Sequence, residues 1–301
     1  MTSETQPLAP GLYLVATPIG NLGDITLRAL DILKRADRIA CEDTRQTQKL
    51  LNHYGITTPT ISCHEHNERH RSAELISEVQ NGGVVAVVSD AGMPGISDPG
   101  VVLAQAAIAA GVPVIPIPGA NAALSALVAS GLATAEFQFL GFLPEKAGAR
   151  RTRLEDLAAE SRDAAQTLIF YEAPHRIAAT LADIEAVWGP AVRVALAREL
   201  TKLHEEFLRG AVAEVRKRLE ERDRIRGEFV LLIEAPAKSA TAVGAPGLGS
   251  ETRERIADRV ARLQSELGID EKEALKRLAR ELGQSKSEIY RELQRERARL
   301  K

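Results

Sequence analysis

The stretch VVAVVSDAGMPGISDPG, residues 84–100, runs from five apolar residues directly into a loop that decides how the chain folds. The loop, residues 89–100, holds three glycines, two prolines and two aspartates, a composition that neither a regular helix nor a regular strand tolerates. Long loops at the carboxyl end of a buried strand usually bind a ligand. The two carboxylates disfavour a phosphate and favour a ligand with cationic or hydroxyl groups; a merely tight turn is the alternative.

Apolar runs alternate with helical stretches on both sides of this loop. The apolar runs are residues 12–17, 38–42, 84–88 and 113–119, and the helical stretches between them include residues 26–36 and 101–111. This alternation predicts an α/β domain with a largely parallel sheet, whose ligand site is built by loops at the carboxyl ends of the strands. We assign residues 11–134 to this first domain.

A second α/β domain is predicted for residues 135–236. Four β-rich runs, EFQFLGFLP, TLIFYEAP, RVALAREL and EFVLLIEAP, are separated by segments of helical pattern. The charged helices expected at residues 151–160 and 211–222 look like amphipathic covers over a sheet.

The ends of the chain differ in composition from these domains. Residues 1–10 are expected to be a disordered N-terminus, and residues 237–250, rich in Ala, Gly, Ser and Pro, a flexible linker. The tail, residues 251–301, has helical periodicity throughout and reads as a small module of helix-turn-helix type. An apolar stripe on the first helix is formed by Leu275, Leu278, Ala279 and Leu282. Gly283 ends this helix, and a capping box of Ser285 and Glu288 starts the next one.

The charge balance gives only a weak indication of the partners. The formal net charge is -2, so the whole chain does not attract polyanions. In the tail, 14 Lys and Arg against 11 Asp and Glu give +3, which leaves -5 for the rest of the chain. Two roles for the tail therefore stay open: solvated faces of a small bundle or dimerisation helix, or contact with RNA.

Hydrophobic residues make up 45% and charged residues 27% of the sequence, as in ordinary globular proteins. The start lacks the features of a signal peptide, and no apolar run approaches the roughly 20 residues that span a bilayer. We therefore expect a cytoplasmic protein with no membrane partner, in which Cys41 and Cys63 are reduced thiols.

Two further loops carry ligand-binding features. TPIGNLGDIT, residues 17–26, uses Pro18, Gly20 and Gly23 to let a ligand approach the backbone, but its spacing fits neither the dinucleotide fingerprint nor the phosphate loop. A nicotinamide enzyme or a nucleotidase is therefore disfavoured. In IPIPGANA, residues 115–122, Ala120 and Asn121 stand at a strand-to-helix turn, where either ligand binding or close packing would use small residues.

The segment CHEHNERH raises the question of a metal. Cys63, His64, His66 and His70 have ligand chemistry, but they fall on one loop and helix start without the spacing of a zinc site. A polar loop facing substrate or RNA, or structural capping, accounts for them better, and we predict no metal.

Eight motifs together resemble the family of bacterial small-subunit ribosomal RNA cytidine 2′-O-methyltransferases, within the tetrapyrrole methylase superfamily. They are ATPIGNLGDIT, CEDTR, HEHNE, SDAGMPGISDPG, IPIPGANA, GFLP, FYEAPHR and RELTKLHEE, in this order from residue 16 to residue 206. The resemblance implies two α/β domains of the class III methyltransferase type with a small C-terminal helical module. It also implies S-adenosylmethionine in the cleft between the domains, no metal, a homodimer, and small-subunit ribosomal RNA or the small ribosomal subunit as partner.

The resemblance also implies which residues surround the cofactor. The predicted cofactor-binding residues are Pro18, Ser89, Asp90, Ala91, Gly92, Met93, Ile96, Ser97, Asp98, Ala120, Asn121, Tyr171, Glu172, Ala173 and Ala197.

Methyl transfer to a ribose requires in-line alignment and help for a poor nucleophile, the 2′-hydroxyl. We predict that Asp43 or Glu199 accepts the hydroxyl proton. Arg45, Arg198 or Lys202 would stabilise the developing negative charge and hold a phosphate. Each of these side chains, like Glu172 and Arg176, could instead be a salt-bridge partner or a helix cap.

Three functions are weighed. The favoured one is 2′-O-methylation of a cytidine near the decoding centre of small-subunit ribosomal RNA. The alternatives are a C-methyltransferase acting on a tetrapyrrole precursor of cobalamin, and a non-catalytic RNA-binding protein.

Overall fold

The computed structural model describes residues 7–64, 67–160, 164–236, 256–282, 289–290 and 293. The chain divides into two compact units, Met1–Ala242 and Val243–Lys301. The predicted linker, Gly283, and the capping box of Ser285 and Glu288 lie outside the described residues.

The larger unit contains ten strands and eight α-helices among its described residues. In chain order they are β1 Gly11–Val15, α1 Leu27–Arg35, β2 Arg38–Cys41, α2 Thr44–His53, β3 Thr60–Ser62, α3 Glu68–Gln80, β4 Val84–Val88, α4 Val101–Ala109, β5 Val114–Ile117, α5 Ala122–Ser130, β6 Phe137–Phe142, α6 Ala147–Ala159, β7 Gln166–Glu172, α7 Ile177–Trp188, β8 Arg193–Arg198, β9 Glu206–Ala211, α8 Val212–Glu220 and β10 Phe229–Ala235, with a short 3-10 helix at Leu22–Asp24 between β1 and α1.

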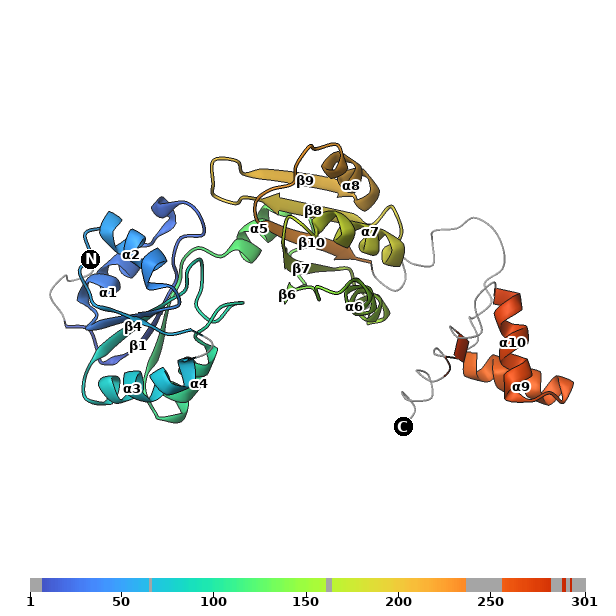
Figure 1. Ribbon diagram of the computed structural model, residues 1–301, viewed down its shortest axis with the longest axis horizontal. Coiled ribbons are helices and arrows are strands. Elements are labelled where there is room, and N and C mark those ends of the chain that lie inside the picture. The colour runs from blue at the N-terminus through green and yellow to red at the C-terminus, as the bar shows by residue number, and fades with distance from the viewer. Residues whose placement is uncertain are drawn as a thin grey trace. The chain divides into compact units, whose positions relative to one another are not determined.

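The first sheet has the order β3-β2-β4-β1-β5, and all its strand pairs are parallel. Alternate residues of each strand face opposite sides, so each face has its own core. Val15, Ile39 and Ala86 pack with α1 and α2, whereas Leu12 and Val85 pack with α3 and α4 (Figure 1). The predicted parallel α/β arrangement is therefore present, with β3 as a short edge strand that the sequence analysis did not identify.

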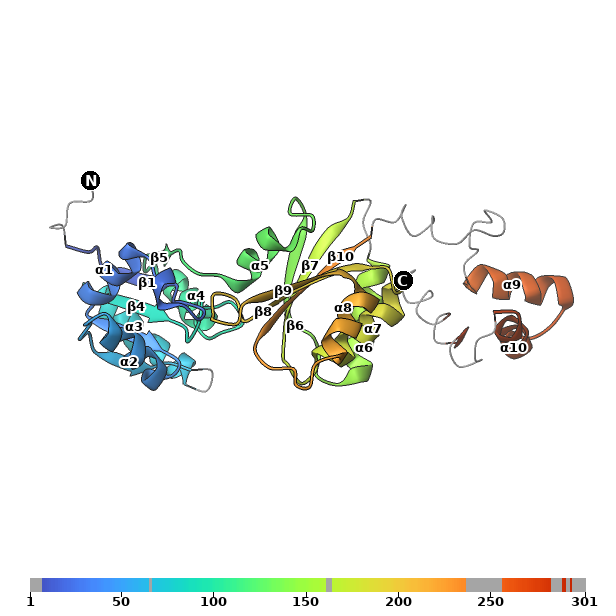
Figure 2. The same cartoon turned by 90° about the horizontal axis from the view of Figure 1, so that it is seen from above.

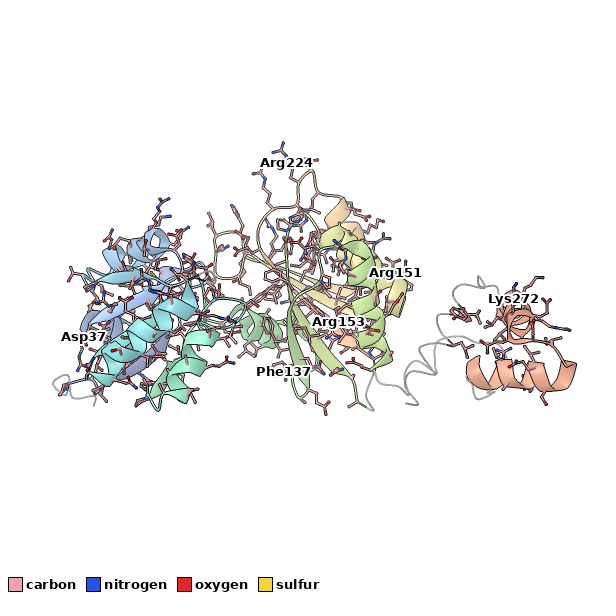
Figure 3. The ribbon with its side chains drawn as sticks, turned by 60° about the horizontal axis from the view of Figure 1, so that its bottom comes forward. Asp37, Phe137, Arg151, Arg153, Arg224 and Lys272 are labelled. Carbon is pink, nitrogen blue, oxygen red and sulfur yellow. The ribbon has the colours of Figure 1, made fainter. Side chains whose placement is uncertain are left out.

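The second sheet is mixed, with the order β6-β7-β10-β8-β9. β6 and β7 pair in parallel, whereas the pairs β7–β10, β10–β8 and β8–β9 are antiparallel. Helices α6, α7 and α8 cover one face of this sheet (Figure 2). Arg151 of α6 and Arg224 of the loop after α8 extend outward to solvent (Figure 3).

Helix α5 links the two sheets. Its buried residues Ala123, Ala126 and Leu127 pack against Ile169 and Val230, on the face of the second sheet opposite α6 to α8. The sequence analysis places α5 in the first domain, up to residue 134. This assignment was wrong for the packing of α5, because the apolar side of the helix lies on β7, β8 and β10.

Part of the predicted disordered N-terminus is ordered. Leu8 packs against the core of the first sheet, and the Tyr13 hydroxyl donates a hydrogen bond of 2.8 Å to the carbonyl of Ala9. Residues 7–10 thus correct the expectation of disorder over residues 1–10, of which residues 1–6 lie outside the described part.

The smaller unit contains α9 Ile256–Leu267 and α10 Glu271–Leu282. Leu275, Leu278 and Ala279 of the predicted stripe are buried there with Val260 of α9 and with Ile289. The apolar stripe therefore builds a core within this unit. None of the described helices is long and apolar enough to cross a membrane.

Candidate cofactor and acceptor site

The two glycine-rich motifs of the first domain meet at the carboxyl ends of β1 and β4. Thr17 and Gly92 form an isolated antiparallel bridge, in which the Thr17 amide donates to the Gly92 carbonyl at 2.9 Å and the Gly92 amide donates back at 3.1 Å. The Thr17 hydroxyl also donates to the Ser89 carbonyl at 3.1 Å. Gly92 has a φ of +84°, a conformation that a residue with a Cβ rarely adopts. The loop over residues 89–100 is therefore fixed against the loop after β1.

A buried carboxylate anchors the far end of the same loop. Glu68, at the start of α3, accepts hydrogen bonds from the amides of Gly100 at 2.9 Å and Leu103 at 3.0 Å. It thereby caps α4 from a neighbouring helix, where Gly100 has no side chain to do so. The HEHNE motif thus contributes a structural clamp for the loop.

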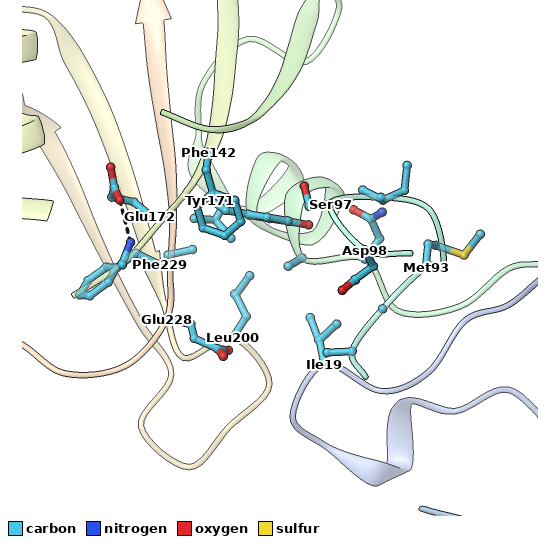
Figure 4. A pocket seen from close by; sticks show the side chains of 18 of the residues that line it. Ile19, Met93, Ser97, Asp98, Phe142, Tyr171, Glu172, Leu200, Glu228 and Phe229 are labelled. Atoms are coloured by element: carbon cyan, nitrogen blue, oxygen red, sulfur yellow. Dashed lines mark hydrogen bonds between the residues drawn. The ribbon is translucent and has the colours of Figure 1, made fainter. Parts of the chain in front are cut away.

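The loop forms one wall of a cavity of about 400 Å³. Figure 4 shows Ile19, Met93 and Asp98 on the first-domain side and Tyr171 and Leu200 on the side of the second sheet. We call this space the first cavity. Its complete lining is Ile19, Ala91, Gly92, Met93, Ile96, Ser97, Asp98, Asn121, Ala122, Phe142, Tyr171, Glu172, Ala173, Pro174, Ala197, Leu200, Glu228, Phe229 and Val230.

The wall from the second domain is mainly apolar and aromatic. Tyr171, at the end of β7, makes edge contacts with Phe139 and Phe142, with ring centroids 4.9 and 5.7 Å apart. The Glu172 side chain is fully buried and accepts hydrogen bonds from Arg176 at 2.7 Å and Thr180 at 2.8 Å. Glu172 therefore holds the turn after β7 in place and has little capacity left for a ligand.

A second cavity of about 340 Å³ adjoins the first and shares Ile19, Ala91 and Glu228 with it. It is more polar than the first cavity, because hydroxyl, amide, ammonium and carboxylate groups surround it. Its lining is Thr17, Pro18, Ile19, Gly20, Leu22, Gln46, Thr47, Lys49, Leu50, Ser89, Asp90, Ala91, Lys202 and Glu228.

Two carboxylates of the first-domain loop, Asp90 and Asp98, have raised pKa values. Burial, together with the charges of Glu42 and Asp90, raises the pKa of Asp98 to about 6. Burial also raises the pKa of Asp90, where a weak hydrogen bond from the Asp43 amide opposes the shift and the Asp43 charge adds to it. Both carboxylates are thus stronger bases than a solvated aspartate.

Two second-domain carboxylates, Glu199 and Glu206, have lowered pKa values instead. Glu199 accepts hydrogen bonds from the Glu228 amide at 2.9 Å and the Lys202 ammonium at 3.0 Å. Burial alone would raise the pKa of Glu199, but these hydrogen bonds hold it below its usual value. Hydrogen bonds from Arg222 likewise lower the pKa of Glu206.

Comparison with known proteins identifies the family of this chain. Residues 11–216 match the family of Tetrapyrrole (Corrin/Porphyrin) Methylases. The chain belongs to this family. It is 54% identical over 223 residues to "Ribosomal RNA small subunit methyltransferase I" of Halalkalibacterium halodurans, covering 74% of this chain and 75% of that protein. It is 47% identical over 267 residues to the protein of the same name from Synechocystis, covering 88% and 94%.

The solved structures similar to this chain include uroporphyrin-III C-methyltransferase from Thermus thermophilus complexed with S-adenosylhomocysteine, at a TM-score of 0.50 and 18% identity. The alignment covers 77% of this chain and 99% of that one. At this identity the likeness concerns the fold. The fold class, the family resemblance and the assignment as a methyltransferase are confirmed by these relatives.

Most of the predicted cofactor residues of this tetrapyrrole methylase line one of the two cavities. Pro18, Ser89 and Asp90 line only the second cavity, whereas Ala120 lines neither. The predicted cofactor residues in the first cavity are Ala91, Gly92, Met93, Ile96, Ser97, Asp98, Asn121, Tyr171, Glu172, Ala173 and Ala197.

The predicted catalytic residues are not brought together as expected. Only Lys202 lines a cavity, the second one, and its ammonium is shared between Glu199 and Glu228, at 3.0 and 2.8 Å. Asp43 caps α2 by accepting a hydrogen bond from the Arg45 amide at 2.8 Å. The Arg198 guanidinium donates to the Arg226 carbonyl at 2.6 Å.

Several lining residues were missed by the sequence analysis. Phe229, Val230 and the preceding Glu228 reach the first cavity because β10 lies between β7 and β8, an order that local patterns do not reveal. Thr47 and Lys49 reach the second cavity from α2, which the sequence analysis treated only as a polar helix. Their position immediately after CEDTR, a segment that follows a strand, is the signal that could have identified them.

Cys41, Cys63 and His64 line neither cavity. Cys41 and Cys63 are buried free thiols. Burial raises the pKa of both thiols, to about 11 for Cys63, where the nearby Glu68 charge adds to the effect. No group of three or more His, Cys, Asp or Glu side chains able to hold a metal occurs among the described residues, and His66 lies outside them.

Proposed function

We propose that this chain transfers a methyl group from S-adenosylmethionine to the ribose 2′-hydroxyl of a cytidine in small-subunit ribosomal RNA, near the decoding centre. The observation that carries the proposal is a pair of adjoining cavities in a tetrapyrrole methylase whose relatives are named as ribosomal RNA small subunit methyltransferases. An apolar cavity beside a polar one suits a nucleoside-type methyl donor beside a hydrophilic acceptor.

The first cavity fits S-adenosylmethionine chemically. The cofactor supplies a methyl group on a positively charged sulfur. Asp98 offers a carboxylate to its cationic groups, while Tyr171 and Phe142 offer an aromatic surface to its purine. Gly92 lines the cavity with its backbone, because it has no side chain of its own.

The contribution of the protein to such a reaction is chiefly alignment. Holding both reactants in a near-attack geometry can lower the barrier by roughly 7–11 kcal/mol. The Thr17–Gly92 bridge and the Glu68 clamp fix the loop that would align them. A side chain must still hold the proton of the hydroxyl group as it leaves.

The test is transfer of labelled methyl groups from S-adenosylmethionine to purified small ribosomal subunits and to naked ribosomal RNA, followed by mapping of the label. We expect a single labelled cytidine ribose. Label on a base carbon, or methylation of a tetrapyrrole with no labelling of RNA, would contradict the proposed acceptor. Binding of RNA without methyl transfer would favour a non-catalytic protein.

We also propose that the enzyme works in the cytoplasm as a homodimer and that the tail, residues 251–301, contacts RNA. The exposed residues Lys272, Lys276 and Arg277 of α10 support contact with a polyanion. Removal of residues 243–301 should weaken RNA binding and flatten its salt dependence. Each phosphate contact adds about 0.7–0.9 to the steepness with which log K falls as the logarithm of the salt concentration rises. S-adenosylmethionine affinity should not change. An unaltered salt slope would show that the tail serves another purpose, such as dimerisation, which sedimentation would detect.

A further inference from the structure

The second cavity contains two polar groups without adequate partners. Thr47 Oγ1 is buried beside the Cys41 thiol, a weak hydrogen-bonding group, and it has no hydrogen-bond partner in the described structure. The Asp90 carboxylate receives only one long contact, 3.4 Å from the Asp43 amide. By contrast, the hydroxyls of Thr17 and Ser89 donate to main-chain carbonyls at 3.1 Å. A ligand with hydroxyl groups would form hydrogen bonds with both the Thr47 hydroxyl and the exposed Asp90 carboxylate.

The cations at this cavity that form no ion pair among the described residues lie on the α2 side. The Lys49 ammonium of α2 lines it and donates at 2.7 Å to Gln46, a neutral partner that leaves its charge uncompensated. Arg45 lies one turn earlier on α2, is exposed, and its guanidinium makes no ion pair within the described residues. Lys202, on the opposite side, is neutralised by two carboxylates. An anionic group entering the cavity would therefore bind at α2.

The second cavity also lies where an acceptor would have to be. It shares Ala91 and Ile19 with the first cavity, so a ligand in one reaches the edge of the other. Asp90 immediately precedes Ala91 in the loop that separates the two spaces. No other carboxylate among the described residues lines this cavity except Glu228, which is bound to Lys202.

We propose that the second cavity receives the acceptor ribonucleotide, that Asp90 accepts the proton of its ribose hydroxyl, and that Lys49 and Arg45 hold its phosphate. This inference rests on the proposed function and names the acceptor side of the same site. The proton moves to an Asp90 carboxylate oxygen while the hydroxyl oxygen bonds to the methyl carbon, and the carbon–sulfur bond breaks with its electron pair remaining on sulfur. Solvent then removes the proton from Asp90.

The surroundings of Asp90 and Glu199 favour Asp90 as the proton acceptor. The raised pKa of Asp90 makes it a better proton acceptor than Glu199, whose pKa is lowered by its hydrogen bonds. Asp43, predicted from the sequence as a base, becomes a positioning residue that caps α2 and directs its amide toward Asp90.

The decisive variant is Asp90→Asn, measured in single-turnover methylation of small ribosomal subunits by the full-length protein. We expect the rate to fall about 10²–10⁴-fold, the usual loss when a general base is removed. With S-adenosylmethionine kept saturating at every pH, the wild-type rate should decline at low pH as Asp90 becomes protonated, and this limb of the pH profile should vanish in the variant. S-adenosylmethionine affinity by calorimetry and the unfolding temperature should match those of wild type. Asp31→Asn, a change in an exposed ion pair with Arg35, is the matched control.

Lys49→Gln tests the phosphate contact separately, with RNA affinity as its readout. We expect weaker RNA binding and a salt slope smaller by about 0.7–0.9, with S-adenosylmethionine affinity intact. A rate for Asp90→Asn within tenfold of wild type, or an unchanged salt slope for Lys49→Gln, would overturn the corresponding assignment. If the wild-type protein itself does not label RNA, the proposed function fails instead, so the two failures are distinguishable.

Discussion

The two domains differ in how many ion pairs and hydrogen bonds their carboxylates near the site form. On the first-domain wall, Asp90 and Asp98 have raised pKa values and few hydrogen bonds. On the second-domain side, Glu199 and Glu206 line neither cavity, are held by Lys202 and Arg222, and have lowered pKa values. Proton-accepting and cation-binding capacity is therefore concentrated on the first domain, while the charges of the second domain mainly stabilise its own loops.

The largest effect on cofactor affinity is expected from distorting the loop that carries Asp90 and Asp98. Gly92→Val places a β-branched residue at a φ of +84°, and the loop must leave its bridge with Thr17 to relieve the strain. Strain of up to about 3 kcal/mol corresponds to a loss of about 100-fold in cofactor affinity, measurable by calorimetry. Gly111→Val is the control, since Gly111 has a φ of +71°, open space around it and no place in either cavity. Equal affinities in the two variants would remove the loop from the cofactor site.

Asp98→Asn tests whether the raised pKa on the first wall serves the cofactor. The free protein has an Asp98 pKa of about 6, and a cationic ligand favours the charged carboxylate. Wild-type affinity for S-adenosylmethionine should therefore fall as pH decreases through 6, whereas the variant should bind about tenfold more weakly at pH 7.5 and show no such dependence. Calorimetry at pH 5.5, 6.5 and 7.5 measures both. Glu74→Gln, in an exposed ion pair, should retain the wild-type pH dependence.

The smallest effect on the methylation rate is expected from a change at Glu199. Glu199→Gln removes a carboxylate that is already committed to Lys202 and the Glu228 amide, so the single-turnover rate should fall less than about tenfold. Rapid-quench measurements at saturating cofactor would decide it. A rate lower than wild type by a hundredfold or more, in a normally folded variant, would identify Glu199 as the general base instead.

Local patterns predicted the parts of this structure that depend on local order. The alternation of apolar runs and helical stretches predicted the parallel first sheet, and the loop composition predicted the position of Gly92 and Asp98 beside a cavity. Residues brought in by strand order, such as Phe229 and Val230, could not be found in this way. The pairing of β3 and β9 and the packing of α5 also depend on distant partners.

The catalytic assignments were least predictable because charge environment is a property of three-dimensional contacts. RELTKLHEE contains the residue types of an acid–base site, yet the structure pairs Glu199 with Lys202. CEDTR likewise offers Asp43, which serves as a helix cap. Asp90 was predicted as a cofactor ligand because it belongs to the SDAGMPGISDPG loop, and its position in the second cavity is the observation from which we propose a role toward the acceptor.

The two buried cysteines make this chain suitable for site-specific labelling. Thiol-reactive dyes attack thiolates, and Cys41 and Cys63 are both inaccessible and held protonated at neutral pH. A cysteine introduced at an exposed position, such as Glu273→Cys, would therefore react selectively with the native pair left in place. With a second dye on Arg224→Cys, energy transfer could follow how the helical tail approaches the larger unit as RNA binds.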